Sequence, residues 1–127
     1  RTIFLGEPNE KQREIYNIVL DAQLRALDAI KPGKLGKDID KVARDYITSK
    51  GYGQYFSHNL GHNIPKTDGP GFTPESETIL RPGMILTVEP GIYINGWGGV
   101  RIEDDVLITE DGCEIMTKST KEIVVIK

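Results

Sequence analysis

This sequence has few cysteines and histidines and no long apolar run. Its 127 residues include a single cysteine and only two histidines. The lone thiol, Cys113, excludes an internal disulfide framework and is typical of a reducing compartment, so we expect a cytoplasmic location. No apolar stretch approaches the roughly 20 residues that cross a bilayer, so no membrane is expected as a partner.

An excess of either charge is also missing. The net charge is −3 at pH 7, which gives no electrostatic reason to expect nucleic acid as a partner. With 38% hydrophobic and 28% charged residues, the composition is that of an ordinary globular protein. We expect one domain, residues 1–127, long enough to bury roughly two-thirds of the surface that the unfolded chain exposes.

Two helical patterns occupy the first half of the chain. Apolar residues recur at spacings of three and four over residues 9–30, with Asn9 as a plausible N-cap and Pro32-Gly33 as the stop. A second amphipathic pattern runs over residues 38–49 and stops before Gly51. The sequence therefore predicts two helices, each with one buried face.

Short strands are predicted elsewhere. They fall at residues 1–5, 55–57, 84–88, 91–94, 100–108, 114–117 and 122–126. Turn residues at Pro82-Gly83, Asn95-Gly96 and Asp111-Gly112 separate several of them. Two helices followed by hairpin-linked strands predict an α+β fold with the helices packed on one face of an antiparallel sheet. The strand at residues 1–5 starts abruptly, so we expect that an upstream segment is missing.

One histidine and two glutamates have the most distinctive surroundings in the sequence. His62 ends His-Asn-Leu-Gly-His, Glu89 follows an apolar strand and precedes Pro-Gly, and Glu103 lies in Val-Arg-Ile-Glu-Asp-Asp. If these side chains converge, one imidazole nitrogen and several carboxylate oxygens are available to a divalent transition metal.

The strand pattern around Glu103 favours such a role. By alternation Glu103 shares a strand face with Arg101 and Asp105, opposite Ile102. An unpaired polar group on a buried face costs about 2–7 kcal/mol, and a charge costs more. A metal ion or an arginine beside the carboxylate removes that penalty.

These motifs, in this order and at these separations, resemble the pita-bread metallopeptidases, chiefly aminopeptidase P and prolidase (Xaa-Pro dipeptidase), and more distantly methionine aminopeptidase. The similarity runs from Arg1 to about Ile126 and includes Ile30-Lys31-Pro32-Gly33 and Gly51-Tyr52-Gly53. It implies about half of a pita-bread fold, the C-terminal portion of the catalytic domain.

The resemblance also implies roles for individual residues. His62, Glu89 and Glu103 would be metal ligands, with Glu89 also accepting a proton from the attacking water and Glu103 bridging two ions. Arg101 would support the ligand carboxylates, and His58 would line the substrate site. The implied reaction is hydrolysis of an N-terminal Xaa-Pro bond, with a peptide that has proline second as substrate and two Mn²⁺, Co²⁺ or Zn²⁺ ions in the complete site.

The chain departs from the family pattern at two places. The family's two aspartate ligands would lie upstream, while Asp38, Asp40 and Asp45 fall in a helical pattern and match no ligand motif. Residues 63–70 form a shorter loop than the family's and contain no histidine. We therefore expect one metal or none in this chain alone, and negligible turnover unless the missing N-terminal half is supplied. The expected partner of the chain is that half or, in a homodimer, a second copy.

Two other interpretations remain open. The chain could be a catalytically silent pita-bread module that binds peptides or proteins, or an excised or redesigned half-fold whose open strand edges favour dimerisation. Individual residues also have simpler explanations: His58 as a packing or surface side chain, Trp97 as a loop anchor instead of a substrate-facing lip. We interpret Asp104 and Asp105 as a solvated acidic turn and Cys113 as structural.

Overall fold

The computed structural model describes residues 1–127 as two helices, one 3₁₀ turn and nine short strands. Neither helix is long and apolar enough to cross a membrane. In chain order the elements are β1 (Phe4–Leu5), α1 (Glu10–Ala29), α2 (Gly36–Ser49), η1 (Gly53–Tyr55), β2 (Gly61–His62), β3 (Gly71–Phe72), β4 (Ile85–Val88), β5 (Gly91–Ile94), β6 (Gly98–Arg101), β7 (Asp104–Ile108), β8 (Cys113–Ile115) and β9 (Val125–Ile126).

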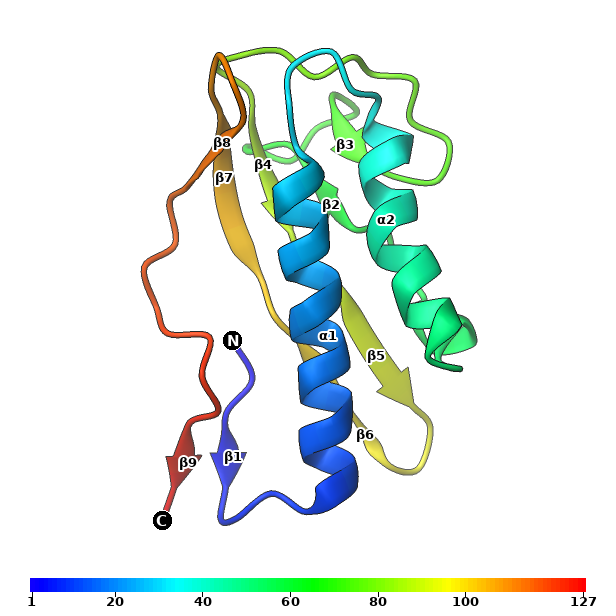
Figure 1. Ribbon diagram of the computed structural model, residues 1–127, viewed down its shortest axis with the longest axis vertical. Helices are drawn as coiled ribbons and strands as arrows, with labels where there is room; N and C mark the ends of the chain where they lie inside the picture. The colour runs from blue at the N-terminus through cyan, green and yellow to red at the C-terminus, as the bar shows by residue number, and fades with distance from the viewer.

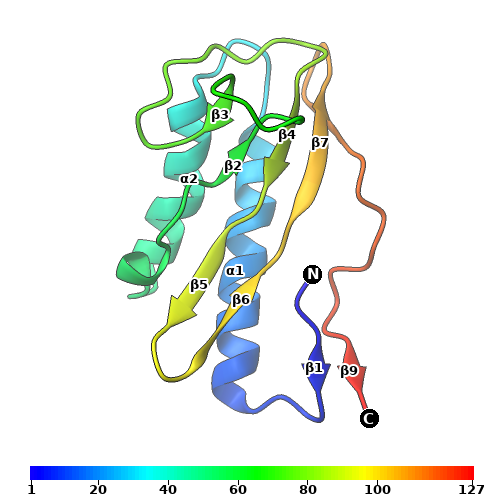
Figure 2. The ribbon, with the colours of Figure 1, turned by 180° about the vertical axis from the view of Figure 1, so that it is seen from behind.

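Helix α1 forms where the sequence predicts it, and its caps explain its limits. The Asn9 side chain accepts from the Gln12 backbone, and the Gln12 side chain accepts from the Asn9 backbone, so the first turn is closed by a capping box. The helix crosses one face of the hairpin strands β4 to β7 (Figure 2). Its buried face toward them consists mainly of small and branched apolar residues: Ile15, Ile18, Val19, Ala22 and Ala26.

Helix α2 lies beside α1 and against β3 (Figure 1). It begins at Gly36, two residues before the predicted start, at a point where the chain passes very close to β3. A Cβ on Gly36 would collide with the Gly71 carbonyl oxygen. The predicted inward residues Ile39, Ala43 and Ile47 are fully buried.

The hairpin strands share one register. Strand β4 pairs antiparallel with β7, and β5 pairs antiparallel with β6. No residue is gained or lost between the two ladders, so one register continues from the first into the second. The predicted single strand over residues 100–108 is wrong, since Ile102 and Glu103 separate β6 from β7. The break lies opposite Pro90, which has no N–H to give to the ladder, so regular pairing stops there.

Three other strand predictions need correction. Residues 55–57 form no strand, because the 3₁₀ turn η1 turns Phe56 into the core instead. The two-residue strands β2 and β3 pair antiparallel and were not predicted. Strands β1 and β9, at the two ends of the chain, are only two residues long and pair parallel to each other, so the sheets are not wholly antiparallel.

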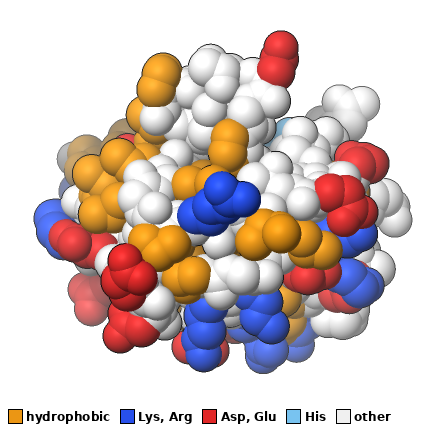
Figure 3. Space-filling view, turned by 90° about the horizontal axis from the view of Figure 1, so that it is seen from above, with side chains coloured by type: hydrophobic (Ala, Val, Ile, Leu, Met, Phe, Trp, Pro, Cys, Tyr) orange, Lys and Arg blue, Asp and Glu red, His pale blue; other side chains and the backbone are white.

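The architecture is the predicted α+β arrangement, with helices on one side of small sheets (Figures 1 and 2). The loops before α2, β4 and β8 gather at one end of the molecule. Seen from that end, acidic and basic side chains are interspersed with small apolar patches (Figure 3). That face therefore carries no continuous field of one sign.

Candidate active site

Glu89 and Glu103 occupy facing positions at the break between the two hairpin ladders. The shared register, with Val88 opposite Asp104 and Gly91 opposite Arg101, sets Glu89 across from Glu103. The backbone of Glu89 is fixed on its other side, because its N–H donates to the Leu60 carbonyl at 2.8 Å. The predicted pair of carboxylates therefore does converge, and the sheet itself brings the two together.

The ionisation of Glu103 depends on its surroundings. Burial is the main reason that the pKa of Glu103 lies above its ordinary value, and the charge of Glu89 and a hydrogen bond with it raise that pKa further. The guanidinium of Arg101 acts in the opposite direction. A cation bound beside Glu103 would favour its charged form.

His62 is held beside Glu89 because β2 packs against β4, and an isolated bridge joins Asn63, just after β2, to Leu86 of β4. Its backbone N–H donates to Thr87 Oγ1 at 3.0 Å, and the ring Nδ1 lies 2.9 Å from the Asn63 carbonyl. A carbonyl only accepts, so Nδ1 carries the proton and Nε2 keeps its lone pair. That Nε2 lies 3.5 Å from Glu89 Oε2, which places a nitrogen and an oxygen donor side by side.

A chain of polar contacts joins His58 to Arg101 through a tyrosine that the sequence did not single out. His58 Nδ1 lies 2.7 Å from the Asn59 carbonyl, and Nε2 lies 2.7 Å from the Tyr93 hydroxyl. Contact with the Tyr93 side chain is also the chief reason that the pKa of Arg101 is raised. Tyr93 therefore lies between His58, which was predicted to line the substrate site, and Arg101, which was predicted to support the ligand carboxylates.

Glycines make room for this tyrosine. A Cβ on either Gly91 or Gly99 would collide with the Tyr93 ring. No periodicity in the sequence distinguishes Tyr93, because its role depends on register with β6, which appears only once the hairpin is formed.

Helix α2 supports the segment that carries His58. Asp40 is almost fully buried and accepts a hydrogen bond from the Leu60 N–H at 3.0 Å. Arg44 pairs with Asp40 and donates to the carbonyls of Phe56 and His58, at 3.0 and 2.9 Å. Asp40, which matched no ligand motif in the sequence, has a positioning role here. Its spacing of four from Arg44 was the available signal.

These side chains open onto one cavity of about 440 Å³. It is lined by charged and polar groups and by loop 63–70, which contributes Lys66 and Thr67. Lys66 takes part in no ion pair within the chain. The predicted site residues on the cavity wall are His58, His62, Glu89 and Arg101, whereas Glu103 is not among the lining residues.

The nitrogen and oxygen donors of the site are of the types that bind a divalent transition metal, but too few of them lie together to form a complete ligand set. One imidazole nitrogen with adjacent carboxylate oxygens suits Mn²⁺, Co²⁺ or Zn²⁺. The contacts are pairwise, however, His62 with Glu89 and Glu89 with Glu103. No three histidine, cysteine, aspartate or glutamate side chains come together closely enough to hold an ion. The chain thus offers part of a ligand set.

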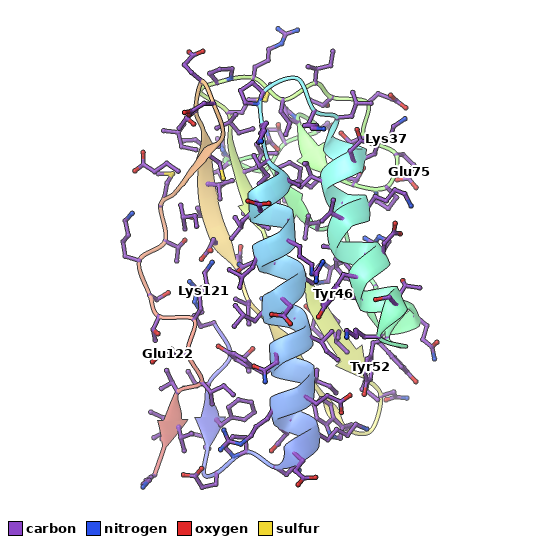
Figure 4. All side chains as sticks on the ribbon, viewed as in Figure 1. Lys37, Tyr46, Tyr52, Glu75, Lys121 and Glu122 are labelled. Atoms are coloured by element: carbon purple, nitrogen blue, oxygen red, sulfur yellow. The ribbon has the colours of Figure 1, made fainter.

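The interpretation of Asp104 as a solvated residue is wrong. Its side chain is fully buried, with Arg1 Nη2 2.6 Å from one carboxylate oxygen and Lys121 Nζ 2.6 Å from the other. Arg1 also donates to the Glu103 carbonyl. Lys121 reaches this point from the C-terminal segment that runs beside the N-terminal residues (Figure 4). The acid next to Glu103 is therefore a structural anchor, while Asp105 is half-buried.

Comparison with known proteins gives consistent matches over this chain. The profile of metallopeptidase family M24 matches residues 1–110. The Xaa-Pro dipeptidase of Pyrococcus furiosus is 54% identical over 125 residues, which are 97% of this chain and 36% of that protein.

Solved structures agree with the sequence relatives. The Xaa-Pro dipeptidase from Bacillus anthracis superposes with a TM-score of 0.95 at 55% identity, covering 99% of this chain and 36% of that one. The X-Pro aminopeptidase from Thermotoga maritima gives 0.94 at 44% identity, covering 99% and 36%. The chain therefore spans about a third of the length of the relatives it matches.

Proposed function

Since the chain belongs to metallopeptidase family M24, we propose that it forms part of the catalytic domain of a peptidase that hydrolyses an N-terminal Xaa-Pro bond. The substrate would be a peptide with proline in second position. The observation that carries this proposal is the facing pair Glu89 and Glu103 with His62 beside it. A relative named Xaa-Pro dipeptidase matches nearly the whole chain that surrounds these residues.

The metal ligands we propose are His62, Glu89 and Glu103. A bound divalent metal would supply an acidified water and polarise the scissile carbonyl. Glu89, which lines the cavity, would take the proton of that water, and Arg101, which favours the charged form of Glu103, would support the ligand carboxylates. Mn²⁺, Co²⁺ and Zn²⁺ all suit such mixed nitrogen and oxygen donors.

His58 would orient the substrate. It lines the cavity, and Tyr93 occupies its Nε2 while the Asn59 carbonyl occupies its Nδ1. With both ring nitrogens engaged, the imidazole is fixed in place and is ready to contact a substrate group by its edge or face. This role makes His58 a binding residue of the proposed peptidase.

The remaining ligands would come from polypeptide beyond these 127 residues or from a second copy of the chain. The shortage of donors supports this, since no three of them meet in the chain itself. We also propose that the protein works in the cytoplasm, on the ground that its one cysteine is free.

A metal titration tests the ligand assignment. We expect Mn²⁺ to bind the wild-type chain, as measured by calorimetry, and Glu89→Gln or Glu103→Gln to weaken binding by more than the roughly 10–100-fold that loss of an outer-sphere partner costs. Glu75→Gln, an exposed carboxylate elsewhere (Figure 4), is the matched control and should leave the affinity unchanged.

The same experiment addresses the alternative of a catalytically silent binding module. The loop at residues 63–70, which has no histidine, favours that alternative. A silent module would show equal and weak Mn²⁺ binding in all variants, together with retained affinity for an Ala-Pro peptide. Hydrolysis of Ala-Pro by the isolated chain with added Mn²⁺ would instead contradict the expectation that this chain alone has negligible turnover.

A further inference from the structure

A buried glutamine of α1 contacts both segments that carry the facing glutamates. Gln23 has no exposed surface, and its Nε2 donates to the carbonyls of Val88 and Ile102, each at 3.2 Å. Val88 immediately precedes Glu89, and Ile102 immediately precedes Glu103. One side-chain amide therefore ties together the two strand ends from which the carboxylates project, from the face that α1 covers (Figure 2).

This contact fills a gap in the ladder. The register sets Pro90 opposite Ile102, and the Ile102 N–H donates to the Pro90 carbonyl at 3.3 Å. The reciprocal bond cannot form, because proline has no N–H. Buried carbonyls are nearly always hydrogen-bonded, and the Gln23 amide supplies the donor that Pro90 lacks.

The orientation of the Gln23 amide follows from the same contacts. Its Oε1 is buried and receives no hydrogen bond from the protein. The flipped amide would set that oxygen against the two carbonyl oxygens, which is worse than leaving it without a donor. The amide therefore directs its N–H groups at the strand ends, and its oxygen is left without a hydrogen-bond donor.

We propose that Gln23 is a positioning residue that fixes the separation of Glu89 and Glu103 across the ladder break. As far as metal binding is concerned, this rests on the proposed function. Glu89 is held from the other side by Leu60, so Gln23 completes a two-sided support for that strand end. Without the amide, the two strand ends would be joined at this point only by the single bond from Ile102 to Pro90.

Metal affinity tests the positioning role. We expect Gln23→Met, which keeps the volume and removes the donor, to weaken Mn²⁺ binding about tenfold or more, in the range seen for outer-sphere partners. Tyr46→Phe is the control. Tyr46 of α2 donates to Asp21 Oδ2 of α1 at 3.0 Å, so its loss removes a hydrogen bond between the helices without touching a site residue and should leave the affinity unchanged.

A double-mutant cycle with Pro90 gives a readout without metal. Pro90→Ala restores a backbone N–H opposite the Ile102 carbonyl. We therefore expect Gln23→Met to lower the urea midpoint of unfolding less in the Pro90→Ala background than in the wild-type background. A variant that is merely badly packed would be equally destabilised in both backgrounds.

The outcomes separate this inference from the function it builds on. Equal destabilisation in both backgrounds overturns the role of Gln23, whatever the metal results are. Wild-type affinity in Gln23→Met overturns it as well. If the wild-type chain binds no Mn²⁺, the proposed metal site fails, and a positive cycle still supports Gln23 as the residue that sets the carboxylate separation.

Discussion

Among single residues, Glu103 determines how the site responds to pH. Its pKa is raised above the ordinary value of 4.5, so the folded chain keeps a proton that the unfolded chain releases. That proton stabilises the fold below pH 4.5, and the contribution is lost as the pH rises through the raised value. We expect the free energy of unfolding of the metal-free chain to include a decline over this window, measured by urea unfolding at a series of pH values.

The variant Glu103→Gln isolates that decline. A neutral amide cannot titrate, so the pH curve of the variant should be flatter than that of the wild type above pH 4.5. Identical curves for the two proteins would show that the pKa of Glu103 is not raised in the folded chain. Added Mn²⁺ should also reduce the decline, because a cation between the carboxylates displaces the proton.

The sequence predicted those site residues whose neighbours form unusual short motifs. His62 and Glu89 stand next to glycine and proline in ways that mark turns and strand ends, and the structure sets them side by side. Tyr93 and Gln23 carry no such mark. Their roles arise from contacts across the hairpin, and a tyrosine in a strand or a glutamine in a helix reads as ordinary packing until the register is known.

At the scale of elements, the close packing of β2 against β4 places His62 beside Glu89, and one glycine permits it. A Cβ on Gly61 would collide with the carbonyl of Thr87. We expect Gly61→Ala to push β2 away from β4 and to lower the free energy of unfolding by about 1–3 kcal/mol, the usual cost of overpacking. Chemical denaturation measures this, and Mn²⁺ affinity should fall in parallel because His62 moves with β2.

Gly112→Ala is the control for that substitution. The nearest atom to its new Cβ would be the Ile30 carbonyl oxygen, at 3.9 Å, which is an ordinary contact. Equal stability of both variants would indicate that β2 can shift without cost, and the proposed coupling between Gly61 and the site would then be wrong.

Elements were predictable in proportion to their length. Helix α1 has apolar residues at helical spacing along its whole length and a capping box at its start, and both features can be recognised in the sequence. Strands β2 and β3 are two residues long and each begins with glycine, which disfavours strands, so neither gave a signal. The interruption between β6 and β7 was missed because the residues around it alternate as in a continuous strand, and Pro90, its cause, lies on the other strand.

For the whole molecule, the buried ion pairs of Asp104 join the two ends of the chain to the middle of the sheet. Arg1 and Lys121 both reach this carboxylate. We expect Asp104→Ala to lower the free energy of unfolding by about 3–5 kcal/mol, because two cations then lose their buried partner. Thermal or urea unfolding measures the loss.

Asp105→Ala is the companion variant, since Asp105 is half-buried and forms no ion pair in the chain. It should cost far less. Similar losses for the two variants would contradict the anchoring role of Asp104. The sequence could not reveal this cluster, because its members lie at residues 1, 104 and 121 and only the closed fold brings them together.

The common register of the two ladders limits how such chains can change in length. Residues added at the hairpin tip, between Ile94 and Gly98, leave Glu89 opposite Glu103. One residue inserted between Val88 and Gly91 would reverse which way the following side chains face, unless the opposite strand gained one too. The number of residues between the two glutamates is therefore a poor criterion for finding distant homologues. A better criterion is the position of each glutamate relative to the strand next to it: Glu89 directly follows β4, and Glu103 directly precedes β7.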